Sequence, residues 1–276
     1  MGGLGNQLFQ IFIVMRYALM YKVEVGFSDK KELGGENTTL RHTYWDSLFT
    51  SLQPFLFSQE PSFHQVNREN GFPYQEFPKP NLGQNTIFIG YFQSYRYFQD
   101  KFQDIIELLQ LSKKRYQVLG KVLQISTFHP SSISMHFRLG DYKKFPLYHP
   151  ILPKEYYRDA LLAIGVIGGT SVLYFCEDED VEDVQKTIDW LKNDFDLKFQ
   201  RAPASLEDWE QLLFMSCCRH HIIANSSFSW WGAYLGVSLD TTKEKVVCYP
   251  SVWFGEAVKH NTEDLFPPKW RKISVS

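Results

Sequence analysis

The segment His136-Phe-Arg-Leu-Gly-Asp-Tyr142 holds residue types that bind phosphate and move protons. An apolar run, Ser134 to Phe137, enters it and is typical of a short strand. Arg138 leaves this strand beside a glycine, where a guanidinium can grip a phosphate with two charge-assisted hydrogen bonds. Asp141 can orient that arginine or take a proton from a substrate hydroxyl. The alternative is a structural Arg–Asp pair that closes the strand, and His136 taken alone fits a core histidine better than a catalyst.

A second segment, Asn225-Ser-Ser-Phe-Ser-Trp-Trp-Gly232, follows a predicted strand and opens a predicted helix. Asn225, Ser226 or Ser227 would cap that helix whatever the function. The N–H groups at the helix start can also cradle a diphosphate, to which the two serines add hydroxyls. Phe228 is available for stacking on a base.

The chain begins with a glycine-rich turn, Met1-Gly-Gly-Leu-Gly-Asn-Gln7, that runs into a predicted helix. Clustered glycines before a helix let main-chain N–H groups approach an anion, and the helix dipole assists them. A flexible amino terminus is the alternative. No strand precedes the turn in this chain, since Met1 stands there.

An acidic run, Glu177-Asp-Glu-Asp180, follows the predicted strand Ser171 to Cys176. Three interpretations stay open for it: a metal-and-nucleotide motif, carboxylates that bind a guanine, or acidic residues that favour the start of the next helix. His220 and His221 would point to opposite faces of a strand, and the other histidines show no ligand spacing. We therefore expect no metal site.

The elements that must position these residues alternate from Ser131 onward. Apolar strand-like runs and helix-like segments follow one another on short connections, which predicts a parallel sheet covered on both faces. That is a Rossmann-like domain, whose ligand lies at the carboxyl ends of its strands. The predicted strands are 134–137, 171–176, 197–200, 221–224 and 245–249, and the predicted helices are 153–163, 181–191, 206–217 and 228–235.

The first half of the chain is less regular. Helices are predicted over 7–21, 97–109 and 113–124, and strands over 23–27 and 86–89. The stretch from Glu32 to Asn85 is rich in Pro, Asn and Gln and predicts loops. A break at Ser126 to Ser132 is the predicted hinge, which gives an α/β protein with two domains, 1–128 and 129–276, facing each other across a cleft.

Composition narrows the function classes. The 276 residues carry a net charge of -2, which argues against a nucleic-acid binder with a broad basic face. No apolar stretch reaches the length of a membrane span, although association with a membrane surface stays open. The four cysteines are irregularly spaced, as in a cytoplasmic protein with reduced thiols. Aromatic residues make up 16% of the chain, a surplus that suits both a thick core and walls around a sugar site.

Taken in order, the segments resemble the α-1,2-fucosyltransferases of glycosyltransferase family 11, nearly end to end. The second segment, extended to Ala224 and Ala233, is similar to the most specific signature of that family. The segment from His136 to Tyr142 resembles a motif shared more loosely across fucosyltransferases. Three more stretches fall where the family has its own: Gly2-Gly-Leu-Gly-Asn-Gln-Leu-Phe9, Ile89-Gly-Tyr-Phe-Gln-Ser94 and Pro250-Ser-Val-Trp-Phe254.

The resemblance implies a GT-B fold, with the acceptor mostly on the first Rossmann-like domain and a GDP-sugar on the second. It implies an inverting, metal-independent transfer of L-fucose from GDP-β-L-fucose to the 2-hydroxyl of a galactose-containing glycan, with no cofactor. Arg138 would hold the β-phosphate and His136 would help to position the site. Asp178 would contact guanine, and Asn6 would approach the phosphate or the fucose. Asp141 is the expected base.

Three departures from the family pattern keep alternatives open. Leu139 replaces a second arginine of the motif, Met1 stands where an apolar strand is usual, and Cys176-Glu-Asp178 stands where the family often has S-D-D. The alternatives are a transferase that uses another nucleotide sugar, including a metal-dependent enzyme that uses a UDP-sugar, and a non-catalytic relic that binds a glycan or a nucleotide.

Overall fold

A computed structural model describes residues 2–34, 40–81, 83–239 and 244–275. Met1 and residues 35–39 and 82 of the predicted loop region lie outside this part of the chain. Contacts divide the chain into two compact units. Unit 1 comprises Met1–Lys114 and His260–Pro267, and unit 2 comprises Arg115–Lys259 and Pro268–Ser276.

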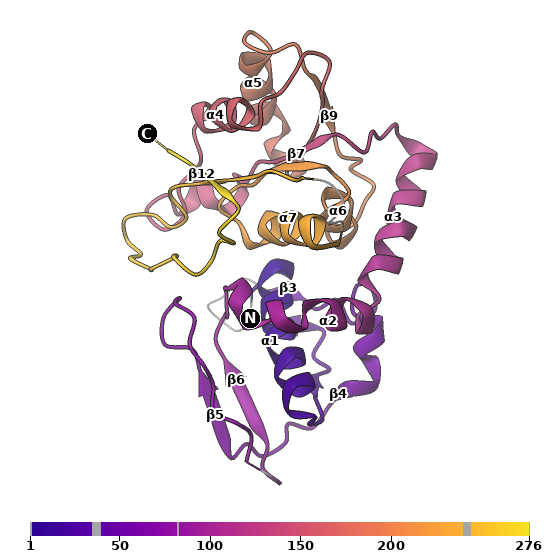
Figure 1. Ribbon diagram of the computed structural model, residues 1–276, viewed down its shortest axis with the longest axis vertical. Coiled ribbons are helices and arrows are strands. Elements are labelled where there is room, and N and C mark those ends of the chain that lie inside the picture. The colour runs from indigo at the N-terminus through magenta and orange to yellow at the C-terminus, as the bar shows by residue number, and fades with distance from the viewer. Residues whose placement is uncertain (1, 35–39, 82, 240–243, 276) are drawn as a thin grey trace. The chain divides into compact units, whose positions relative to one another are not determined.

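Unit 2 is built on one six-stranded parallel sheet, in the order β12-β11-β10-β7-β8-β9 (Figure 1). If the six strands are numbered one to six in chain order, the sheet read across from β9 to β12 has the order 3-2-1-4-5-6. This is the strand order of dinucleotide-binding domains. The order reverses between β7 and β10, and ligands bind at such a switch point. The Rossmann-like prediction is confirmed for this unit. Its strands are β7 (Ile133–His136), β8 (Ser171–Phe175), β9 (Lys198–Arg201), β10 (His220–Ile222), β11 (Val247–Pro250) and β12 (Arg271–Ile273).

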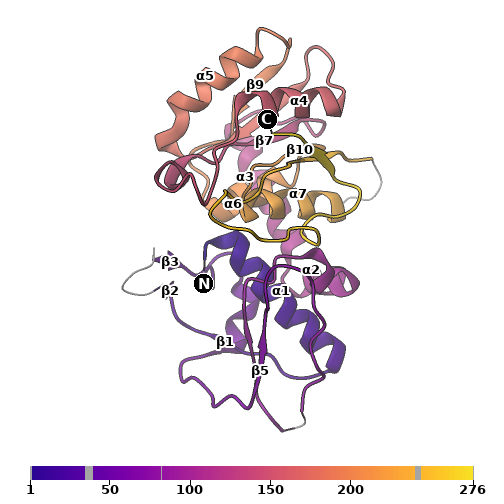
Figure 2. The same cartoon turned by 90° about the vertical axis from the view of Figure 1, so that its left-hand side faces the viewer.

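Helices cover both faces of this sheet. Figures 1 and 2 show α4 and α5 on one face and α6 and α7 on the other. All four residues of β7 are buried, as expected of a central strand between two helical layers. The helices of the unit are α3 (Leu111–Ile125), α4 (Lys154–Ile164), α5 (Val181–Leu191), α6 (Asp208–Met215) and α7 (Ser227–Leu239), with short 3-10 turns η4 (Gly140–Lys144) and η5 (Asp178–Asp180).

Unit 1 differs from the predicted Rossmann-like domain. Its described strands form three separate two-stranded pairs, β1-β4, β2-β3 and β5-β6, instead of one sheet. Helix α1 contacts α2, η2 and η3, and Figure 2 shows α1 and α2 in this unit. The elements are α1 (Leu4–Tyr21), β1 (Phe27–Ser28), β2 (Glu32–Leu33), β3 (Arg41–His42), η1 (Thr50–Phe55), β4 (Leu56–Phe57), β5 (Gln65–Arg68), β6 (Thr86–Ile89), η2 (Tyr95–Tyr97), η3 (Gln99–Lys101) and α2 (Phe102–Leu108). Among the described residues, no helix combines the length and the apolar character needed to cross a bilayer.

The division between the units differs from the predicted hinge at Ser126 to Ser132. It falls within α3, most of which belongs to unit 2, where Lys121 forms an ion pair with Glu210 of α6 at 2.8 Å. The segment His260–Pro267 returns to unit 1, where Asp264 pairs with Arg96 at 2.6 Å and accepts a hydrogen bond from the main-chain N–H of Tyr74. The domain boundary therefore depends on contacts between distant parts of the sequence.

Most of the aromatic side chains near the recognised motifs lie in the cores of the units. Trp230 and Trp231 are fully buried, as predicted, and Phe92 and Trp253 are buried as well. Trp230 stacks on Tyr234 with 4.7 Å between ring centres. Of the two uses that the sequence left open for its aromatic surplus, a thick core and walls around a sugar site, these four residues serve the first.

Candidate functional site

The loops that follow β7, β8 and β10 carry most of the predicted site residues. Strand β7 lies between β8 and β10 in the parallel sheet, so the three loops leave the same edge. His136 ends β7, and Arg138 and Asp141 follow it. The acidic run follows β8, and Asn225 to Phe228 follow β10. The structure thus brings together the segments that the sequence offered separately.

Arg138 lies among carboxylates. Its guanidinium forms ion pairs with Asp141, at 2.5 Å, and with Glu177. The guanidinium carbon also lies 5.1 Å from the centre of the Tyr142 ring. The side chain is 19% exposed, so it is largely shielded but still reachable from solvent. An arginine held in this way offers a fixed positive charge for a phosphate, provided that the phosphate replaces a carboxylate.

His136 is buried at the end of β7. Burial, and secondarily the charge of Arg138, lowers the pKa of this imidazole to about 3. Its ring centre lies 5.5 Å from that of Phe228, across the switch point. The ring is therefore neutral near pH 7 and packs between the two loops, which favours a positioning role over that of an acid.

This pKa predicts that the protein loses stability in acid. An unfolded histidine binds a proton below about pH 6.5, whereas the folded His136 does not, so stability falls from about pH 6.5 down to the folded pKa of about 3. Between pH 7 and pH 5 we expect His136 to contribute a loss of about 2 kcal/mol in the free energy of unfolding. Urea unfolding at both pH values measures it. If the free energy of unfolding falls between pH 7 and pH 5 by as much in His136→Gln as in the unsubstituted protein, this prediction is contradicted.

Four residues after β10 have different roles. Ser226 caps α7, because its hydroxyl accepts from the N–H of Phe228 at 3.3 Å. Asn225 does not cap the helix: its side-chain amide donates to the carbonyl oxygens of Pro150, at 2.9 Å, and Trp253, at 3.3 Å. Ser227 and Phe228 form the first turn of α7 and are partly exposed. The N–H groups of a first turn have no main-chain acceptors within the helix, which suits an anion.

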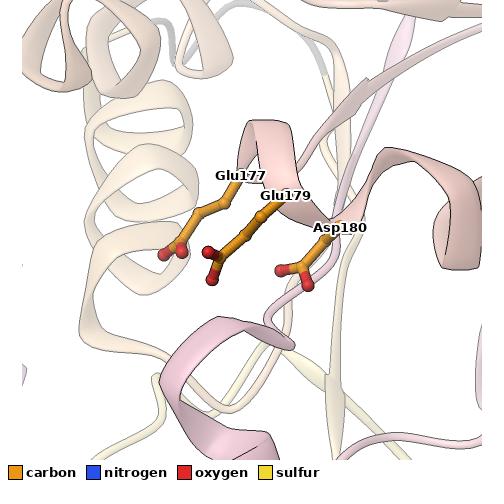
Figure 3. Close-up of side chains that lie close together, drawn as sticks. All are labelled: Glu177, Glu179 and Asp180. Carbon is orange, nitrogen blue, oxygen red and sulfur yellow. The ribbon is translucent and has the colours of Figure 1, made fainter.

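Two carboxylates of the acidic run bind groups in the loop that carries Arg138. Figure 3 shows the carboxylates of Glu177, Glu179 and Asp180 side by side, and one oxygen from each lies within 4.8 Å of the other two. The buried Asp180 accepts from the N–H of Gly140 at 2.7 Å and from Lys143 at 2.8 Å. With Glu177 paired to Arg138, two of the three carboxylates bind cations and N–H groups of this chain.

The two remaining predicted residues have partners outside this group. Asp178 is 81% exposed and pairs with Arg201 at the end of β9. Asn6 belongs to unit 1, where its side-chain oxygen accepts from Gln93 at 2.8 Å. Because Gln10 also donates to the carbonyl oxygen of Gly90, at 3.0 Å, the glycine-rich turn and the segment from Ile89 to Ser94 are joined within that unit.

Leu139 stands where the family motif has a second arginine. It is partly buried and packs against the hydrophobic core of unit 2. The departure from the motif is therefore accommodated by apolar packing.

We expect Leu139→Arg to lower stability without raising activity. A guanidinium in these apolar surroundings would lose water contacts at a cost of roughly 1–3 kcal/mol in the free energy of unfolding. Urea unfolding and transferase assays of both proteins measure the two effects. Higher turnover at unchanged stability would contradict the prediction and favour the relic interpretation.

Three residues of the loops after β7 and β8 were not predicted as site residues. Glu177 and Tyr142 contact Arg138, and Lys143 pairs with Asp180. The register of β7 and β8 pairs His136 with Phe175, so the residues two positions further, Arg138 and Glu177, leave the sheet side by side. For Glu177 this register was the missing signal, because the sequence alone favoured its neighbour Asp178.

The strand order defines unit 2 as an α/β domain of the doubly wound class, with the predicted site residues at its switch point. The model of glycosyl transferase family 11 matches residues 71–274, and the chain belongs to that family. It is therefore a glycosyltransferase, an enzyme class that uses a nucleotide-sugar donor and a glycan acceptor.

Two relatives from Escherichia coli are similar along nearly their whole length. An alpha-1,2-colitosyltransferase is 29% identical over 99% of this chain and 96% of its own. The O-antigen biosynthesis glycosyltransferase WbnK is 26% identical over 92% of this chain and 93% of its own.

Among solved structures, the Escherichia coli ADP-heptose lps heptosyltransferase II is 14% identical, with a TM-score of 0.38 over 58% of this chain and 43% of its own. A family 9 glycosyl transferase from Veillonella parvula is 15% identical, with a TM-score of 0.35 over 58% and 39%. The chain thus spans less than half the length of these two structures.

Proposed function

We propose that this protein transfers L-fucose from GDP-β-L-fucose to the 2-hydroxyl of a galactoside, with inversion at the anomeric carbon. The observation that carries the proposal is the position of Arg138 and the first turn of α7 at the ends of the adjacent strands β7 and β10. A guanidinium and a helix N-terminus at one switch point suit a diphosphate.

The reaction breaks the bond between the fucose anomeric carbon and the diphosphate and forms a bond to the acceptor oxygen. Negative charge grows on the departing GDP, and Arg138 together with the N–H groups of α7 would stabilise it. Glu177 and Asp141 each accept from one N–H of Arg138, and their negative charges would repel a phosphate, so the proposal has one of them give way to a phosphate oxygen. The carboxylate of Asp141, once released, would accept the proton of the acceptor hydroxyl.

Metal-independent transfer is part of the proposal. A metal at the acidic run would compete with Arg138 for Glu177 and with Lys143 and Gly140 for Asp180. The chain's own cations and N–H groups therefore already neutralise two of the three carboxylates that lie together. The contribution that a metal makes elsewhere, a positive charge beside the leaving group, would come here from Arg138.

A colitosyl donor is the second candidate, favoured by the relative named as an alpha-1,2-colitosyltransferase. Colitose differs from L-fucose in lacking the 3-hydroxyl group, so the same diphosphate contacts would serve both donors. The GT-B arrangement of two domains, the contact of Asp178 with guanine, the role of Asn6 and the cytoplasmic location stay predictions.

The experiment is a transfer assay with a simple β-galactoside in the presence of EDTA. GDP-fucose, GDP-colitose and a UDP-sugar are compared as donors, and NMR of the product identifies the linkage. We expect transfer from a GDP-sugar to the 2-hydroxyl, unaffected by EDTA. Activity that disappears with EDTA and returns with Mn²⁺ would contradict the metal-independent mechanism, and GDP binding without any transfer would favour the relic.

A further inference from the structure

One aromatic side chain contacts both halves of the proposed diphosphate site. The ring of Tyr142 lies beside the Arg138 guanidinium, with 5.1 Å between the guanidinium carbon and the ring centre. Its hydroxyl donates a hydrogen bond to the carbonyl oxygen of Asn225 at 3.0 Å. The same ring stacks on His149 with 4.5 Å between centres and 20° between planes. Tyr142 therefore links the loop after β7 to the loop after β10.

The partner of the hydroxyl is itself fixed. Asn225 is 2% exposed, and its side-chain amide donates to the carbonyl oxygens of Pro150 and Trp253. Asn225 directly precedes Ser226, the residue that caps α7. A hydrogen bond to Asn225 thus fixes the distance between the Arg138 loop and the start of that helix.

The contact with the ring leaves the donors of Arg138 available. Carboxylates and phosphates compete for the N–H groups at the edge of a guanidinium, whereas an aromatic ring contacts its face. Tyr142 can therefore hold the guanidinium while Glu177 is exchanged for a phosphate. A side chain that is already held loses less conformational freedom when the ligand binds, and this raises affinity.

We propose that Tyr142 is a positioning residue for the donor diphosphate, which sets Arg138 and the first turn of α7 at the separation that one diphosphate spans. This inference rests on the proposed function, because it takes a nucleoside diphosphate as the ligand. Tyr142 itself need not touch the donor.

The test is calorimetric titration with GDP, which requires no transfer. The proteins are the unsubstituted chain, Tyr142→Phe, Tyr142→Leu, Arg138→Ala and both Tyr142 variants combined with Arg138→Ala. The control is Tyr148→Phe, because Tyr148 lies in the same loop with its side chain half exposed. We expect Tyr142→Phe, which loses only the hydroxyl, to weaken GDP binding about 3-fold and Tyr142→Leu about 10-fold. The control should bind as the unsubstituted protein does.

Combination with Arg138→Ala separates positioning from mere stability. If Tyr142 acts through Arg138, then in the Arg138→Ala background Tyr142→Leu and Tyr142→Phe bind GDP with equal affinity. The unfolding temperatures of the two single variants of Tyr142 stay near that of the unsubstituted chain. A purely structural role predicts the same loss in both backgrounds together with a lower unfolding temperature, and would overturn the inference. Should Tyr142→Leu not fold, Tyr142→Phe decides, and unchanged GDP affinity in that variant overturns the inference.

The proposed function and the inference fail differently. GDP binding that depends on Arg138 but not on Tyr142 overturns the inference and leaves the proposed function intact. If the unsubstituted protein does not bind GDP, the proposed function is overturned and the inference with it.

Discussion

Arg138→Ala is expected to lower kcat/KM for the GDP-sugar by about 10²–10³-fold, the range found when one donor to a developing oxyanion is removed. Arg138 lies at the switch point of the sheet and is 19% exposed, so its charge lies where the proposal places the diphosphate. Removing it also leaves Glu177 and Asp141 without their shared cation, and their repulsion of a diphosphate adds to the loss. The measurement is steady-state transfer with EDTA present, alongside calorimetric titration with GDP.

Two further variants make this result specific. Arg138→Lys keeps the positive charge but loses the forked geometry of the guanidinium. Its activity should therefore lie between that of Arg138→Ala and that of the unsubstituted protein. Arg219→Ala, at an exposed arginine in the same unit, is the control and should behave as the unsubstituted protein. Equal rates for Arg138→Ala and the unsubstituted protein would contradict the role of Arg138 in the site.

Trp230→Ala is expected to lower the free energy of unfolding by about 3–5 kcal/mol, a large part of the stability of a domain. The side chain is fully buried, stacks on Tyr234, and lies 5.5 Å from Trp270 between ring centres. Removing the indole leaves a cavity and ends these ring contacts. Urea unfolding measures the loss.

Trp209→Ala is the matched control for this result. Trp209 is only partly buried, and its indole N–H bonds to Glu207 at 2.8 Å, so its truncation should cost clearly less. A loss of less than about 1 kcal/mol for Trp230→Ala would contradict its place in the core and would point to a ring that faces the ligand.

The regular elements of unit 2 were predictable because their patterns are strong. Helix α5 has its predicted bounds, since an acidic start follows a continuous apolar strand. Strand β12 was missed, because three residues at the edge of a sheet carry little pattern. In unit 1, β6 has its predicted bounds, but β1, β2, β3 and β4 are two residues each, too short to show a period.

Within the site, the sequence predicted contacts inside a single loop but not contacts between loops. The Arg138–Asp141 pair lies three residues apart in sequence, so local reasoning found it. The pairing of Arg138 with Glu177 depends on the register of two strands about 40 residues apart, which the sequence does not encode locally. Asn225 was expected to cap a helix or cradle an anion, but it instead joins two distant carbonyl groups, a role that only tertiary contacts reveal.

The most direct measurement is a crystal structure of the protein with GDP, obtained from EDTA-treated protein. The account predicts that a phosphate oxygen lies within hydrogen-bonding distance of Arg138 and of an N–H group in the first turn of α7, with Glu177 or Asp141 released from the guanidinium. GDP bound instead at the acidic run, with Arg138 still paired to both carboxylates, would contradict it.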